Sequence, residues 1–255
     1  MTICYFTGTG NCLYVARRIG GYLYPIPQLM TQDEIIIKDD AVGIVCPCYA
    51  GEMPMMVRDF LIKADIETEY LFFVYTYGMN YGAAFANAKL ACEEGGLKLS
   101  YVNAIKMVDN YLPGFEIQKQ LDTLPKKDVE GQIAKLLDDI DARKVTEVSI
   151  TSGTKAKIKL QKKFMGDRIL RRDAAREYIV TDDCILCGTC QKVCPSNNIN
   201  VTDKVRFGLN CEVCYACIHN CPKTAIHLKN EKSAVRYRNE HVALKDLFKR
   251  TDNER

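Results

Sequence analysis

The stretch 184-CILCGTCQKVCP-195 is matched by 211-CEVCYACIHNCP-222, which begins 27 positions later. Both read C-x2-C-x2-C-x3-C-P, so residues 184–222 contain an internal repeat. Three thiolates at this spacing on a short loop can reach three corners of one iron–sulfur cubane, and the proline ends the loop after the fourth cysteine. The pattern predicts eight iron–sulfur ligands: Cys184, Cys187, Cys190, Cys194, Cys211, Cys214, Cys217 and Cys221.

Two other uses of paired cysteines fit this pattern less well. Structural zinc needs only four sulfurs, and it has no need of the third cysteine of each triplet or of the repeated Cys-Pro. A disulfide framework is typical of secreted chains, whereas residues 1–12 have no basic region followed by an apolar stretch. No run of about 18 apolar residues occurs either. We therefore expect a cytoplasmic protein without a membrane span.

The two runs resemble bacterial-type two-cluster ferredoxin domains, and the resemblance covers residues 178–230. It implies two [4Fe–4S] clusters, with the fourth cysteine of each run ligating the other cluster. The implied ligands of cluster one are Cys184, Cys187, Cys190 and Cys221, and those of cluster two are Cys211, Cys214, Cys217 and Cys194. Since eight cysteines suffice, we expect His219 on the surface or in a layer around the ligands rather than as a ligand.

Composition and charge predict how the chain is divided. Hydrophobic residues make up 47% of the 255 and charged residues 26%, as in globular proteins. Residues 1–150 hold 14 basic and 20 acidic side chains, whereas residues 151–180 hold nine basic and three acidic ones. We predict an α/β domain at 1–150, a basic linker at 151–177, the cysteine-rich domain at 178–230, and a charged tail at 231–255 in which residues 242–248 cap a domain.

The chain begins with a pattern typical of an anion site. A β-favouring run at 2–6 is followed by a glycine loop and then by a helical pattern at 13–23. The amides of such a loop and the start of a helix can face a phosphate. Neither the P-loop pattern nor G-x-G-x-x-G fits, because no Gly-Lys-Ser/Thr follows and Leu13 replaces the third glycine. An ordinary strand-to-helix turn is the alternative.

This loop resembles the phosphate loop of flavodoxins, Thr/Ser-x-Thr-Gly-Asn-Thr, in which hydroxyls and amides hold a monophosphate. The resemblance implies FMN as a cofactor. Cys12 departs from the motif, and a thiol is a weaker hydrogen-bond donor than a hydroxyl. The candidate phosphate residues are Thr7, Gly8, Thr9, Gly10, Asn11 and Cys12.

Further strand and helix patterns follow along the N-terminal half. Strands are predicted at 24–29, 41–46, 70–76 and 97–108, and helices at 53–62, 83–94 and 128–142. About five βα units predict an α/β fold with a flavodoxin-like, doubly wound, five-stranded parallel sheet, followed by a small α+β two-cluster ferredoxin-like domain. In this fold ligands bind beyond the carboxyl ends of the strands, where loops 47–52 and 76–82 join the phosphate loop.

These two loops carry the candidate contacts of a flavin ring. Tyrosine can stack on a flat ring, and glycine lets backbone amides approach it, although each tyrosine is equally suited to packing. The candidates are Pro47, Tyr49, Gly51, Thr76, Tyr77, Gly78, Tyr81 and Gly82. The loop at 109–114 either covers the ring or contacts the cysteine-rich domain. Cys46 is expected in the core, and the role of Cys48 is left open.

Residues 155–172 predict a basic, partly amphipathic helix. Because charge runs usually form solvated faces, we favour a linker helix packed on the acidic N-terminal domain over a docking patch for an acidic electron partner. Nucleic-acid binding is not expected, since the aromatic residues of a single-strand-binding sheet are missing.

Together the two halves resemble the flavodoxin–ferredoxin fusion family, the EFR-type ferrodoxins of anaerobic bacteria. The resemblance rests on residues 7–12, on 47–53 and on both cysteine runs, and it extends over most of the chain. It implies an electron-transfer protein with FMN and two [4Fe–4S] clusters that serves low-potential redox protein partners. The alternatives are an FMN-dependent reductase of a small molecule, fed by its own clusters, and an interaction module with an empty flavin site.

Overall fold

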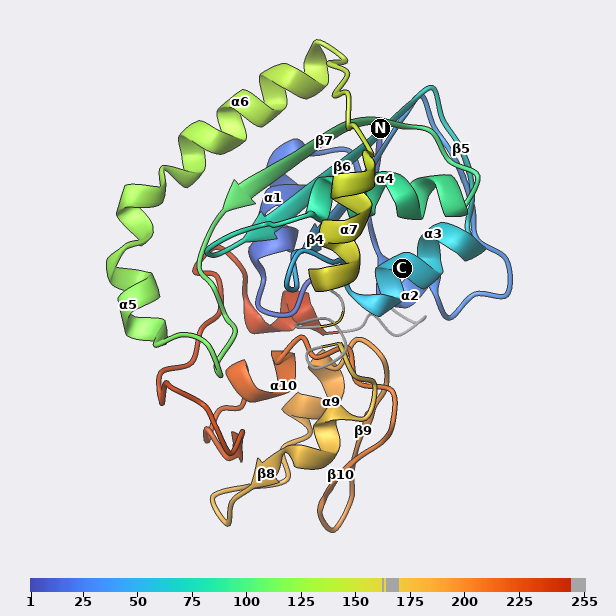
Figure 1. Cartoon of the computed structure of the whole chain (residues 1–255). Coiled ribbons are helices and arrows are strands. Elements are labelled where there is room, and N and C mark those ends of the chain that lie inside the picture. Colours follow the sequence, from blue (N-terminus) through green and yellow to red (C-terminus); the bar gives the residue numbers. More distant parts are fainter. Residues whose placement is uncertain (162, 164–169, 249–255) are drawn as a thin grey trace.

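The N-terminal half is built on one parallel sheet. In the computed structural model, which describes residues 1–161, 163 and 170–248, five strands follow the order β2-β1-β4-β6-β7. Helical crossovers and this order make the predicted flavodoxin-like doubly wound sheet, and Figure 1 shows helices flanking it. The strands are β1 Thr2–Tyr5, β2 Tyr22–Pro25, β4 Ala41–Pro47, β6 Tyr70–Tyr77 and β7 Leu99–Lys106.

Helices cover both faces of this sheet, and each face has its own apolar core. Because successive strand side chains point to opposite faces, Cys4 packs in the core of α3 and α4, whereas Ile3 packs in the core of α1 and α6. The central strands β4 and β6 are buried along nearly their whole length, as parallel strands covered on two faces should be. The helices are α1 Asn11–Ile19, α2 Ile26–Leu29, α3 Met55–Lys63, α4 Ala84–Glu94, α5 Ile117–Asp122, η1 Leu124–Lys127 and α6 Val129–Asp141.

Two predicted boundaries were wrong. The strand predicted at 24–29 ends at Pro25, and the next four residues form α2. Pro27 lies in the first turn of α2, where its missing N–H costs no hydrogen bond, so the chain turns into a helix there. Helix α1 stops at Ile19 because Gly20 follows with a φ of +85°. A small parallel pair, β3 Ile36–Lys38 and β5 Asp65–Glu67, was not predicted.

The cysteine-rich part contains one short unit twice. Strand β8 pairs antiparallel with β11, and β9 pairs antiparallel with β10. This is the small α+β domain that the sequence predicts after the sheet. Its elements are β8 Ile179–Val180, α9 Thr189–Val193, β9 Ile199–Val201, β10 Val205–Phe207, α10 Ala216–His219 and β11 Ile226–His227.

The linker between the two parts begins with helix α7 Ser152–Gln161. Its Ile158 packs against Ala83 and Ala86 at the start of α4, so this portion lies on the N-terminal domain. Residues 162 and 164–169 lie outside the described residues. They include Phe164, Met165 and Ile169, which are apolar residues of the helix predicted at 155–172. Within the described part of the chain, no helix combines the length and the apolar character needed to cross a membrane.

The cysteine-rich part docks at the carboxyl edge of the sheet (Figure 1). Gly8 follows β1, and a Cβ atom on it would lie 2.6 Å from the carbonyl oxygen of Cys214. The carboxylate of Glu212, two residues earlier, accepts a hydrogen bond of 3.0 Å from the amide of Met56 at the start of α3. The second cysteine run is therefore in direct contact with the predicted phosphate loop.

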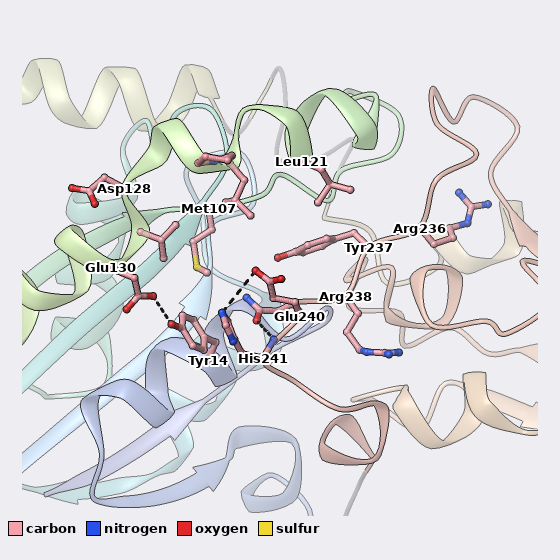
Figure 2. A pocket seen from close by; sticks show the side chains of 14 residues that line it. Tyr14, Met107, Leu121, Asp128, Glu130, Arg236, Tyr237, Arg238, Glu240 and His241 are labelled. Atoms are coloured by element: carbon pink, nitrogen blue, oxygen red, sulfur yellow. Dashed lines mark hydrogen bonds and ion pairs between the residues drawn. The ribbon is translucent and has the colours of Figure 1, made fainter.

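The C-terminal tail returns to the same edge and holds the loop from the other side. The amide of Asn239 donates to the Thr9 carbonyl over 2.8 Å, and the ring of His241 stacks on Tyr14 in α1 at 4.6 Å. Side chains of α1, α5, η1, α6 and the tail surround a cavity of about 490 Å³, shown in Figure 2. The tail ends, among the described residues, with η4 Leu244–Leu247.

Gly8→Ala tests the docking contact. The added methyl group would meet a backbone carbonyl that cannot rotate away, so we expect the substitution to lower the free energy of unfolding by about 1–3 kcal/mol, the usual cost of overpacking. Urea unfolding followed by circular dichroism measures the change. Gly153→Ala is the matched control, because it meets only the Thr151 hydroxyl oxygen, at 3.7 Å. Equal stability of Gly8→Ala and wild type would contradict the close approach.

Candidate functional site

The loop between β1 and α1 is shaped as an anion site. Gly10 is the N-cap residue of α1 with a φ of +98°, and no side chain caps the helix. The first amides of an α-helix have no acceptor within the helix, and an uncapped N-terminus favours a negative charge. Tyr14 is the first residue of the helix whose amide donates a helical hydrogen bond, and its acceptor is the Gly10 carbonyl at 2.9 Å. The amides of residues 11–13 can therefore face a ligand.

The side chains of Thr9 and Cys12 are buried, that of Thr7 is partly exposed, and all three are held in place. The hydroxyl oxygen of Thr7 accepts from the Gly10 amide over 3.1 Å, and the sulfur of Cys12 lies 3.1 Å from the Thr76 hydroxyl oxygen. Burial raises the pKa of Cys12 to about 12, so its thiol is neutral and can donate a hydrogen bond. The hydroxyl oxygen of Thr9 accepts from the side-chain amide of Asn110 over 3.0 Å, which leaves its own proton free to donate.

Asn11 has a different role from the other loop residues. Its side-chain nitrogen donates to the Val108 carbonyl, and its side-chain oxygen accepts from the hydroxyl of Tyr237 over 2.6 Å and from Asn239 over 3.1 Å. Both ends of the amide are thus used within the protein. Asn11 ties the loop to the C-terminal tail.

Two connected cavities lie at this edge of the sheet. A small pocket of about 40 Å³ adjoins the loop and is lined by Thr7, Gly8, Thr9, Asn11 and Cys12. A larger cavity of about 470 Å³ continues from it, and the two share the following lining residues: Cys48, Tyr49, Gly78, Asp109 and Asn110. A ligand with a compact anionic group at one end and a larger flat body would match these two cavities. Its anionic group would lie in the small pocket and its flat body in the larger cavity.

The predicted ring residues are only partly brought together. Pro47, Thr76 and Tyr77 line the small pocket, and Tyr49 and Gly78 line both cavities. Three candidates line neither of these two cavities. Tyr81 stacks on Phe85 at 4.8 Å, Gly51 occupies the turn between Tyr49 and Glu52 with a φ of +79°, and Gly82 donates its amide to Asn80.

Two polar groups of the cavity are available to a ligand. The hydroxyl of Tyr49 is buried and has no hydrogen-bond partner among the described residues. Asp109 accepts from the amide of Tyr111 over 3.1 Å, and burial raises the pKa of its carboxyl group. Gly78 is packed so tightly on Asp109 that a Cβ would lie 2.0 Å from that residue's Cβ. A buried hydroxyl without a partner is costly, so it points to a missing hydrogen-bonding group.

Sequence reasoning missed the wall that the cysteine-rich domain contributes to the cavity. Val213 and Tyr215 line the larger cavity, and they flank Cys214 in the second run. Tyr111 and Gly114 of the loop that the sequence left undecided line it too, and the same loop contacts the cysteine-rich domain, where His219 bonds to the Asn110 carbonyl. No local pattern indicates Val213 or Tyr215, because only docking of the two parts places them there.

The predicted ligands of cluster one come together in space. Cys184, Cys187, Cys190 and Cys221 line one small cavity, although Cys221 belongs to the other run. Burial, with a smaller contribution from the charges of Cys221, Cys187 and Cys184, raises the pKa of Cys190 to about 11. Four thiolates this close repel one another, so they need a positively charged group to ionise together.

The second set shows the same crossing. Burial raises the pKa of the Cys217 thiol most, and the charges of other cysteines raise it further. In decreasing order these are Cys214, Cys211, Cys194 and Cys190, the last two of which belong to the first run. No group of three or more His, Cys, Asp or Glu side chains in the described ranges could hold a single metal ion. Thiolates around a cubane are spaced more widely than those around one ion, because each binds a different iron atom.

Backbone geometry repeats with the cysteines. Leu186 and Val213 have φ values of 53° and 52°, and these two residues are 27 positions apart, like the two runs. Equivalent amides also point at sulfur in both units: those of Asn198 and Ala225 donate over 3.3 Å to Cys194 and Cys221, respectively. Such N–H···S bonds stabilise a thiolate ligand and raise the potential of a bound cluster.

The remaining predicted side chains have packing roles. Cys46 is fully buried in the core, as predicted, and Cys48 lines the larger cavity, with its sulfur 3.7 Å from the Tyr81 carbonyl oxygen. His219 is buried rather than on the surface. It bonds through Nε2 to the Asn110 carbonyl at 2.9 Å and accepts at Nδ1 from the amide of Tyr237 at 3.1 Å. Burial lowers its pKa to about 4, so the ring is neutral.

Comparison with known proteins identifies the kind of domain that holds the cysteine runs. A family model described as "4Fe-4S dicluster domain" matches residues 136–240. No curated protein matches the chain. Among solved structures, it is similar to a protein described as a flavoprotein from Bacteroides uniformis, at 14% identity over 41% of this chain and 89% of that chain, with a TM-score of 0.33.

Two further solved structures are similar at the same level. A short-chain flavodoxin associated with a bacterial microcompartment is 17% identical over 53% of this chain and 97% of its own, with a TM-score of 0.32. A flavoprotein in complex with FMN from Lactobacillus acidophilus is 11% identical over 49% and 97%, with a TM-score of 0.29. The strand order and the cysteine runs carry the assignment: a flavodoxin-like α/β sheet is followed by a small ferredoxin-like 4Fe–4S domain.

Proposed function

We propose that the protein transfers electrons between FMN and two [4Fe–4S] clusters. One observation carries this proposal: residues next to a predicted cluster ligand also line the cavity proposed for the flavin. Val213 and Tyr215 flank a predicted ligand of cluster two, and both line the 470 Å³ cavity, which shares lining residues with the small pocket at the predicted phosphate loop. One cavity therefore adjoins both an anion site and a cluster loop.

The residues around the cavity fit FMN. The uncapped start of α1 and the hydroxyls of Thr7 and Thr9 would hold the phosphate without a cationic side chain. The ring would occupy the larger cavity beside Tyr49, whose buried hydroxyl has no partner in the described part of the chain. When bound, FMN can pass electrons singly or in pairs, which links two-electron chemistry to one-electron centres.

The cysteines fit two clusters with crossed ligands. The four candidates for cluster one line one cavity, and those for cluster two raise one another's pKa. We propose redox proteins as partners, and a cytoplasmic location because eight thiols persist as ligands only in a reducing compartment. Low-potential partners are consistent with clusters of this type, although cluster potentials span a wide range.

Anaerobic purification tests the proposal directly. Iron, acid-labile sulfide and released flavin are measured on one preparation, before and after incubation with excess FMN. We expect eight irons for the two [4Fe–4S] clusters, counted from the eight cysteines, together with stoichiometric FMN. A preparation that contains clusters but takes up no FMN would eliminate the flavin half of the proposal.

Thr9→Ala tests the phosphate loop. The variant loses a hydroxyl donor at the ligand while its helix amides remain, so we expect FMN binding to weaken by about 1 kcal/mol, or roughly fivefold to tenfold. Flavin fluorescence titration measures the affinity, and the iron content should stay unchanged. Thr31→Ala, in an exposed turn outside the site, is the control. Unchanged affinity in Thr9→Ala would place the phosphate elsewhere.

A second candidate function is reduction of a small anionic molecule by the flavin. A recess of about 460 Å³ shares Gly78, Met79 and Phe115 with the larger cavity, and Lys106, Lys126 and Lys127 line it. Steady-state reduction of a carboxylated quinone or enone, faster than with free FMN and lost in Lys126→Ala, would support this candidate. If free FMN reduced the acceptor as fast as the protein does, the reductase candidate would be eliminated and electron transfer would be the only function supported.

A further inference from the structure

The two cysteine runs differ sharply in their exposure. Cys211, Cys214 and Cys217 are buried, and so is Cys194, which joins their predicted set. In the first run Cys187 is exposed, and its neighbours Ile185 and Leu186 are 58% and 42% exposed. The counterpart of Leu186 in the repeat, Val213, is only 5% exposed. The two sites are built on one backbone pattern but lie in opposite environments.

Only the second run reaches the proposed flavin cavity. Val213 and Tyr215 line it, and the Cys214 carbonyl is in contact with Gly8 of the phosphate loop. Among the described residues that line the two connected cavities, none comes from the first run. Electron tunnelling falls steeply with the distance between donor and acceptor, so a ring in this cavity would be coupled far more strongly to cluster two than to cluster one.

The backbone at Tyr215 indicates that its side chain is used. Tyr215 has a φ of 54°, and its counterpart 27 positions earlier is Gly188, with a φ of 73°. Glycine takes such a φ without strain, whereas a tyrosine pays a conformational penalty there. Strain of this kind at a ligand cavity is typical of a functional residue. The repeat keeps the unstrained glycine at the exposed cluster and has the aromatic ring at the buried one.

We propose that the two clusters have a fixed order: cluster two exchanges electrons with the flavin across Tyr215, and cluster one exchanges them with an external one-electron redox protein at the exposed Cys187 loop. The exposed Cys187 loop would receive electrons one at a time from the external donor, and the buried loop of Cys214 would hold the cluster beside the cavity. Two such one-electron transfers from the external donor, with protons taken from solvent, would supply the two electrons that a bound flavin accepts. The same residues would serve the opposite direction, in which the external protein accepts the electrons. This order rests on the proposed function.

Removing one cluster at a time tests the order. Cys187→Ala and Cys214→Ala should each lose half of the iron and sulfide. Bound FMN is then photoreduced by a laser flash under anaerobic conditions, and reduction of the remaining cluster is followed by its absorbance. Cys187→Ala should keep the wild-type fast phase, whereas Cys214→Ala should lose it although flavin and cluster one remain. The opposite pattern would overturn the proposal.

Tyr215→Gly tests the bridge without removing a ligand. It copies Gly188 and relieves the strain of a positive φ, which offsets part of the packing lost with a buried ring, and iron and sulfide analysis checks that both clusters remain. We expect FMN to bind about tenfold more weakly, because an aromatic contact is lost, and the fast phase to slow severalfold at saturating FMN. The control is Tyr22→Phe: Tyr22 is 70% exposed on β2 and lines neither cavity.

The outcomes separate this inference from the function on which it rests. Wild-type protein that takes up no FMN would contradict both. Bound FMN whose electrons reach cluster one first, or a Tyr215→Gly variant that transfers electrons as fast as wild type, would contradict the order alone.

Discussion

The contact between Gly8 and the Cys214 carbonyl is the constraint on which the arrangement of the two parts depends. A side chain at position 8 would meet a peptide carbonyl at 2.6 Å, so only glycine lets the two backbones come this close. The loop that follows β1 and the loop that precedes α10 thus share one boundary, although they lie at opposite ends of the sequence. The larger cavity lies beside this approach and is lined by residues of both parts, among them Tyr49 and Tyr215.

Buried polar groups fix the register of this docking. The side chain of Glu212 is fully buried, and its two oxygens accept from the Met56 amide over 3.0 Å and from Arg172 over 2.8 Å. Burial raises the pKa of this carboxyl group, and these donors oppose the rise. Loss of either donor would leave a buried charge without compensation, which is costly. Arg172 also pairs with Asp59 of α3, so linker, helix and cysteine run meet in one network.

The tail adds a second set of restraints to the phosphate loop. Tyr237 and Asn239 both donate to the side-chain oxygen of Asn11, and His219 accepts from the amide of Tyr237. The asparagine of a flavodoxin-like motif therefore joins three segments here, in addition to lining the small pocket. Because each side-chain nitrogen and oxygen named here has a hydrogen-bond partner, the network holds the loop in place.

The sequence by itself determined what depends on local spacing. Cysteines at two-residue intervals bring Cys184, Cys187 and Cys190 to one cavity, and buried β-favouring runs such as β4 and β6 can form only the centre of a covered parallel sheet. Tertiary structure alone decided which residues from separate segments meet. Tyr81 looks like a ring contact but stacks on Phe85, whereas Tyr215 carries no motif and lines the cavity. The reason is physical: a wall made by docking depends on close backbone approaches and matched buried hydrogen bonds, which leave no periodic trace in the sequence.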